Sequence, residues 1–187
     1  IECAAKSLDC GGMPPLRSAL LRHVWLLPAG TPMNLQAFPR VRPGHWPTPL
    51  EPMKGLARRL GTDRLYIKRD DCTGLATGGS KTRKLEFLVG QAVREGADTL
   101  LTQGAVQSNH VRQTGAAAAF MGLACEAILE ERVADAPAAY HESGNVLLDH
   151  LFGIPLHRVP AGTPMDPALE ALAQKLRARG RKPYVIP

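Results

Sequence analysis

The chain has 187 residues, of which 44% are apolar and 21% are charged, so it is long and apolar enough for a folded domain and is neither disordered nor collagen-like. Its formal net charge is +6, but only 5% of its residues are aromatic, which leaves few side chains to stack on nucleic-acid bases. Because the one basic cluster, at residues 175–182, falls at the expected end of a helix, a small anionic ligand is a better explanation of the charge than a nucleic acid.

The N-terminal part differs from the rest. Residues 1–32 begin without methionine and show no helical or strand period, whereas Met33 could be a natural start. We expect residues 1–32 to be an extension, non-native or disordered, and residues 33–187 to be the folded portion. The prolines from Pro39 to Pro52 predict an extended entry to that portion.

From residue 64 onward, short β-rich runs alternate with amphipathic helical stretches. The pattern predicts strands at residues 65–68, 99–103, 125–129, 155–159 and 184–186. It predicts helices around an apolar stripe at residues 85–93, then at 111–121, 145–152 and 167–179, the last capped by Asp166. This alternation predicts an α/β fold, an open parallel sheet with helices on both faces.

Residues 73–84 carry the first stretch with chemical potential, because Gly78, Gly79 and Lys81 lead directly into the first long helix. Backbone N–H groups at a helix start favour an anion, and nearby cations add to that field. Crowding by Arg83 and Lys84 would also make the amine of Lys81 more available to an aldehyde. Lys84 is the local alternative, and a glycine-capped helix start with solvated lysines explains the stretch equally well. It matches neither G-x-x-x-x-G-K-[ST] nor G-x-G-x-x-G.

Residues 102–110 run from the end of an expected strand into an expected helix, and end with Ser108, Asn109 and His110. Ligands of open parallel sheets bind at the carboxyl ends of the strands, which is where these side chains would lie. Helix capping by Ser108 or Asn109 is the simpler alternative, and the two roles are compatible.

Together, residues 78–87 and 107–110 resemble one family, that of D-cysteine desulfhydrase, L-cysteate sulfo-lyase and aminocyclopropane-carboxylate deaminase. The resemblance runs from about Met33 to Pro187 and implies a tryptophan synthase β-like fold that uses pyridoxal phosphate. It implies that Lys81 binds the cofactor covalently and is the base at the substrate α-carbon. Asn109 would hydrogen-bond the phenolic oxygen of the cofactor, and Lys84 would lie near its phosphate.

The same resemblance assigns the substrate contacts and marks two departures. Ser108 would contact the substrate carboxylate or act as the reactive hydroxyl, with Asn109 and His110 beside the substrate. The family has asparagine where this chain has Ser80. The family also continues beyond the position of Pro187 into a glycine-rich phosphate-binding loop, so we expect the fold to be incomplete.

The expected activity is elimination of the β-substituent of a small amino acid, with release of sulfite or sulfide, pyruvate and ammonia. The alternatives are a deaminase acting on a cyclopropane amino acid and a truncated fragment that binds without turnover. We expect a homodimer at full length, located in the cytoplasm, without a metal, nucleic acid or membrane partner. The four cysteines lack a C-x-x-C pair, which predicts neither a zinc site nor a disulfide framework.

Overall fold

The computed structural model describes residues 34–187, and a parallel four-stranded sheet is its central element. The strand order is β5-β4-β3-β6, with β3 (Thr99–Ala105) and β4 (Ala124–Glu131) in the middle. The outer strands are β5 (Leu156–Pro160) and β6 (Pro183–Ile186). Thr99 is in register with both Ala124 and Pro183, and every pairing in this sheet is parallel.

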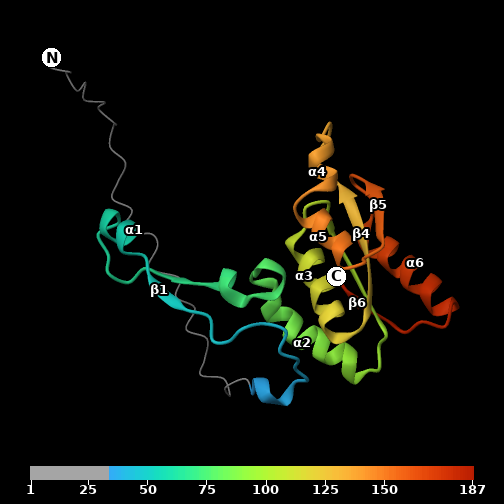
Figure 1. The fold of residues 1–187 in the computed structure, drawn as a ribbon, viewed down its shortest axis with the longest axis horizontal. Coiled ribbons are helices and arrows are strands. Elements are labelled where there is room, and N and C mark those ends of the chain that lie inside the picture. The colour runs from blue at the N-terminus through green and yellow to red at the C-terminus, as the bar shows by residue number, and fades with distance from the viewer. Residues whose placement is uncertain (1–33) are drawn as a thin grey trace. The chain divides into compact units, whose positions relative to one another are not determined.

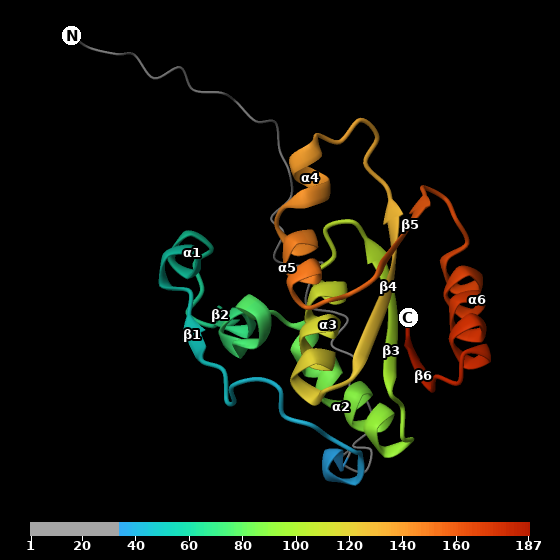
Figure 2. The ribbon, with the colours of Figure 1, turned by 45° about the vertical axis from the view of Figure 1, so that its right-hand side comes forward.

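Helices cover both faces of this sheet (Figures 1 and 2). On one face lie α2 (Lys81–Arg94), α3 (Asn109–Met121) and α5 (Asn145–Leu151), which follows the short α4 (Ala138–Glu142). The other face is covered by α6 (Met165–Ala178), which packs on β3, β4 and β6. The predicted α/β class is therefore confirmed.

The apolar pattern of each helix explains its place. Leu85, Val89 and Ala92 recur at helical spacing on α2 and are fully buried, as the stripe predicted, whereas Val93 at the end of the stripe is 42% exposed. In α3 the run from Gly115 to Ala118 is buried, and a Cβ at Gly115 would lie 1.9 Å from the Ile154 side chain. Small residues thus allow α3 to pack closely in the core that carries the site.

The first predicted strand does not join the parallel sheet. Instead, β2 (Tyr66–Lys68) pairs antiparallel with β1 (Leu50–Pro52), in a separate two-stranded sheet, with Leu50 opposite Lys68. Short strands with largely exposed side chains carry little pattern to indicate their partner. The helix between them, α1 (Lys54–Arg59), was not predicted and buries only Ala57.

The predicted cap of the last helix was also wrong. Pro164 occupies the N-cap and its carbonyl accepts from Ala168 N, so α6 begins before Asp166. The Asp166 carboxylate instead accepts a hydrogen bond from the Gln103 amide at 2.6 Å.

The extension expected at residues 1–32 lies outside the described residues. Within residues 34–187, no helix has the length and apolarity that crossing a bilayer requires.

Candidate active site

Both stretches singled out from the sequence start helices that pack side by side. Lys81 is the first residue of α2, after the short 3-10 helices η2 (Asp70–Thr73) and η3 (Leu75–Thr77). Ser108 is the N-cap of α3, immediately beyond the carboxyl end of β3. A bond from Thr82 N to Gln113 Oε1, 2.9 Å long and buried, joins the two helices near these starts. The fold therefore brings the two stretches to one edge of the sheet.

The glycine turn before Lys81 requires glycine for backbone reasons. Gly78 has φ 78° and ψ 175°, a region open essentially to glycine alone. A Cβ at this position would lie 1.9 Å from the Asp71 carbonyl oxygen. Gly79, with φ 140°, donates its N–H to the Asp70 carbonyl at 2.9 Å. The main chain is thus held in one path just ahead of Lys81.

Lys81, Lys84 and His110 form a group of basic side chains. In the described part of the chain, neither lysine has a carboxylate partner or a side-chain hydrogen bond. Burial lowers the pKa of Lys84, and the charge of Lys81 lowers it further. Burial, followed by the charges of Lys84 and Lys81, lowers the pKa of His110 to about 4. Unbalanced positive charge at a helix start suits an anionic ligand.

Two threonines select the tautomer of the His110 ring, which burial and the two lysine charges keep neutral. The Thr114 hydroxyl donates its proton to the His110 carbonyl at 2.8 Å, so the His110 Nδ1–H donates to the Thr114 oxygen at 3.3 Å. Nε2 then accepts from the hydroxyl of Thr102 at 3.1 Å. Through this arrangement a basic side chain lies beside two lysines without adding a third charge.

We predict that His110 makes the free energy of unfolding depend on pH in the protein free of cofactor. Since the pKa of His110 in the fold is about 4, below the ordinary value of 6.5, the unfolded chain binds more protons between these values. The free energy of unfolding should fall as the pH drops through that window, and less steeply in His110→Gln. Urea unfolding at about pH 7 and about pH 4.5 measures this, with the exposed His150→Gln as control. An equal slope in wild type and His110→Gln would contradict the assignment.

Arg83 does not crowd Lys81, which corrects the sequence expectation. Its guanidinium pairs with Asp70 at 2.5 Å and lies over the Trp46 ring, 4.6 Å from the centroid. An arginine with a carboxylate partner in reach turns toward it rather than toward other cations. Of the two expected neighbours of Lys81, the structure therefore leaves only Lys84.

Ser108 and Asn109 keep the positions expected for them. Ser108 Oγ accepts from Val111 N at 3.3 Å, so the capping role is present, and its close approach to Gly104 leaves no room there for a Cβ. Asn109 is exposed, and its Oδ1 accepts one bond from Arg112 and one from Asn145, each 3.1 Å long. The sequence reasoning missed these two partners. An arginine among the small, buried residues of α3 was the available signal.

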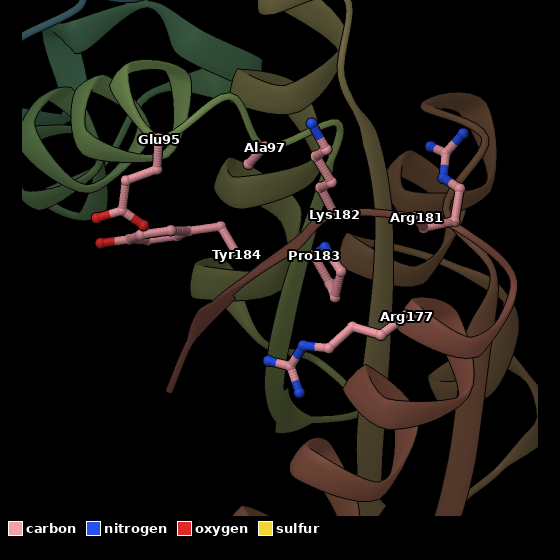
Figure 3. A pocket seen from close by; sticks show the side chains of 7 residues that line it. All are labelled: Glu95, Ala97, Arg177, Arg181, Lys182, Pro183 and Tyr184. Carbon is pink, nitrogen blue, oxygen red and sulfur yellow. The ribbon is translucent and has the colours of Figure 1, made fainter.

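A pocket of about 300 Å³ lies elsewhere (Figure 3). Glu95, Lys182 and Tyr184 line it at the amino ends of β3 and β6, together with Arg177 from α6. Ligands of open parallel sheets bind at the opposite, carboxyl ends. Since none of the predicted site residues lines this pocket, it plays no part in the site.

Residues 41–187 match the family described as pyridoxal-phosphate dependent enzyme. The chain belongs to this family. It is similar to the D-cysteine desulfhydrases of Salmonella paratyphi B and Salmonella newport, with 51% identity to each over 154 residues. Each match covers 82% of this chain and 47% of the relative, so the chain spans about half the length of the curated relatives it matches.

Solved structures agree with this placement in the pyridoxal-phosphate dependent enzymes. A structure named as an ACC deaminase homologue matches with a TM-score of 0.72 and 42% identity, over 82% of this chain and 45% of that one. The diaminopropionate ammonia lyase of Escherichia coli matches with a TM-score of 0.55 over 75% of this chain and 38% of that one. At 18% identity, the latter supports the fold alone.

The residues at the site fit the cofactor of this family. Pyridoxal phosphate carries an aldehyde, a phosphate and a phenolic oxygen, which call for an amine, a cation and a hydrogen-bond donor. Lys81 supplies an amine without a partner within residues 34–187, and Lys84 supplies a cation at the same helix start. Because Asn109 Oδ1 is already occupied, its amide nitrogen, which has no partner within residues 34–187, is the donor that remains.

Proposed function

We propose that this protein is a pyridoxal-phosphate-dependent lyase that eliminates the β-substituent of a small amino acid. The observation that carries the proposal is the amine of Lys81 at the start of α2, next to Lys84 and without an acidic partner in residues 34–187. The positions of Ser108 and Asn109 at the neighbouring helix start support it. The names of the relatives supply the reaction class.

Each site residue then has a distinct role. Lys81 is the residue we assign to covalent attachment of the cofactor and to the proton at the substrate α-carbon. Lys84 would offset part of the phosphate charge, and Asn109 would donate its amide N–H to the phenolic oxygen. Ser108 and His110 would lie beside the substrate, Ser108 by its hydroxyl and His110 as a neutral ring.

The bound cofactor supplies an electron sink for the charge that develops at the α-carbon. Proton removal at that carbon by Lys81 and departure of the β-substituent are the two bond-breaking events. With a thiol as leaving group, cysteine and one water give sulfide, pyruvate and ammonia. With a sulfonate in its place, cysteate and one water give sulfite, pyruvate and ammonia.

D-cysteine is the substrate that the relatives favour, since D-cysteine desulfhydrase is the name they carry. L-cysteate is the second candidate, because the sequence of residues 73–77 and 108–110 resembles the L-cysteate sulfo-lyases as well as the D-cysteine desulfhydrases. The similarity to an ACC deaminase homologue supports a third, a cyclopropane amino acid.

Product identity separates the three candidates. The intact protein, loaded with cofactor, should release sulfide and pyruvate in equal amounts from D-cysteine. Sulfite from L-cysteate would move the assignment to the sulfo-lyase type, and a four-carbon 2-oxo acid from the cyclopropane substrate would move it to the deaminase type. Retention of the cofactor without turnover of any of the three would favour a binding role instead.

The setting of the protein is also part of the proposal. We propose a homodimer, as the resemblance implies, and a place in the cytoplasm, as the cysteine pattern favours, with a small amino acid as substrate and no nucleic-acid or membrane partner. Light scattering of the intact protein tests the dimer, and a monomeric mass at working concentration would contradict it.

A further inference from the structure

Arg112 joins the two stretches of the site from within the core. It belongs to α3 and is only 9% exposed. Its NH2 group donates to the Gly78 carbonyl at 2.9 Å, in the turn that leads to Lys81. Its NH1 group donates to Oδ1 of Asn109 at 3.1 Å and to Oδ1 of Asn145 at 2.6 Å. One guanidinium therefore contacts the lysine turn, the start of α3 and the start of α5.

These contacts determine which way the Asn109 amide points. Arginine only donates, so the Asn145 side chain must turn its oxygen to Arg112 and its nitrogen to Asn109. Asn109 then faces two donors and must present its oxygen to both. Its amide nitrogen, which has no partner within residues 34–187, is thereby turned away from both donors.

Asn145 is itself held by hydrogen bonds, which fixes the orientation of its side-chain amide toward Asn109. Its backbone N–H donates to Gln107 Oε1 and its side chain donates to the Gln107 carbonyl, both at 2.9 Å. The Gln107 amide donates in turn to the carbonyls of Tyr140 and Ser143, before α5. A continuous series of hydrogen bonds therefore links the α4–α5 segment, through Gln107 and Asn145, to Asn109.

A buried carboxylate, that of Asp149, lies close enough to Arg112 to interact with its charge. Asp149, on α5, is fully buried, and neither of its oxygens has a hydrogen bond in the described part of the chain. Burial raises the pKa of Asp149 to about 7, while the charge of Arg112 acts in the opposite direction. A buried guanidinium is costly unless it is paired and hydrogen-bonded, and Arg112 meets this need with its three hydrogen bonds and the nearby charge of Asp149.

We propose that Arg112 is a positioning residue. It fixes the Asn109 amide nitrogen as a donor to the cofactor, and it holds the Gly78 turn, and with it Lys81, in place next to the start of α3. The inference rests on the proposed function, because the donor is useful only if a phenolic oxygen lies opposite it. We assign Arg112 no contact of its own with cofactor or substrate; it acts through Asn109 and Gly78.

The test compares Arg112→Met and Arg112→Lys with wild type in the intact protein loaded with pyridoxal phosphate. Without Arg112, Asn109 is free to rotate and the phenolic oxygen loses its donor, so its protonated form is favoured. The pH midpoint between the near-ultraviolet and visible bands of the bound cofactor should rise by about one unit. The cofactor dissociation constant should rise about tenfold. Arg112→Lys should behave like Arg112→Met, because lysine carries its donors on one nitrogen and cannot span the acceptors that the two guanidinium nitrogens reach.

Two further variants separate positioning from mere stability. Arg181→Met removes an arginine that bonds Thr99 and lies outside the site, and it should lower the melting temperature without shifting the bands. Asn145→Ala removes one of the two donors to Asn109 and should shift the midpoint in the same direction by a smaller amount. If Arg112→Met does not fold, the result for Asn145→Ala decides.

The outcomes are distinct. Unshifted bands in Arg112→Met or, where that variant is unfolded, in Asn145→Ala would overturn the inference alone. So would full recovery in Arg112→Lys, or an equal shift in Arg181→Met. A wild-type protein that loses all colour on desalting would overturn the proposed function, and this inference with it.

Discussion

Lys81→Ala should abolish covalent attachment of the cofactor and reduce elimination by about 10³-fold or more, because the same amine is assigned to attachment and to proton transfer. Lys81 has no acidic partner within residues 34–187, so its loss leaves no buried charge unpaired. We therefore expect the variant to fold normally. Absorbance of the desalted protein and a product assay measure the two effects.

Arg83→Met is the matched control for that prediction. It removes a cation two positions along the same helix, whose partners are Asp70 and Trp46 rather than the site. This variant should lose about 1 kcal/mol of stability and keep its colour and activity. Equal loss of attachment in both variants would show that helix charge, not the amine of Lys81, is what matters.

Gly78→Ala should lower the free energy of unfolding by about 3 kcal/mol or more and weaken cofactor binding with it. Its backbone conformation is essentially closed to alanine, and the new methyl would lie 1.9 Å from a backbone oxygen of Asp71. The clash is with main chain, so relief requires movement of the turn that precedes Lys81. Urea unfolding and cofactor titration of the same samples measure both losses.

Gly96→Ala is the appropriate comparison. Gly96 also has a positive φ, 70°, but a Cβ there meets nothing within 4 Å. It should cost only about 1 kcal/mol, the strain of the left-handed region, and leave cofactor binding unchanged. If the two variants unfold at the same urea concentration, contact with Asp71 contributes nothing.

Regular alternation made most of the fold predictable. The central strands β3 and β4 and the helices α2 and α3 follow from apolar residues at regular spacing, which are buried in the core. β1 and α1 were not predictable in this way, because they bury almost nothing and their residues carry no period. The pairing of β2 with β1 depends on contacts that no local pattern records.

The site was predictable at its helix starts and not in its supporting contacts. Glycines before Lys81 and polar residues after β3 are compatible with an anion site by local chemistry, but they fit helix capping equally well. The pairing of Arg83 with Asp70, which takes it away from Lys81, depends on where Asp70 lies, and the place of Arg112 depends on α5, a distant segment of the chain. The spacing of residues along the sequence predicts neither of these contacts.

The most direct test of the account is the identity of the amine that binds the cofactor. The intact protein is incubated with pyridoxal phosphate, reduced with borohydride and digested, and the modified peptide is sequenced. The account predicts a single label on Lys81. A label on Lys84, or on any other lysine, would contradict it.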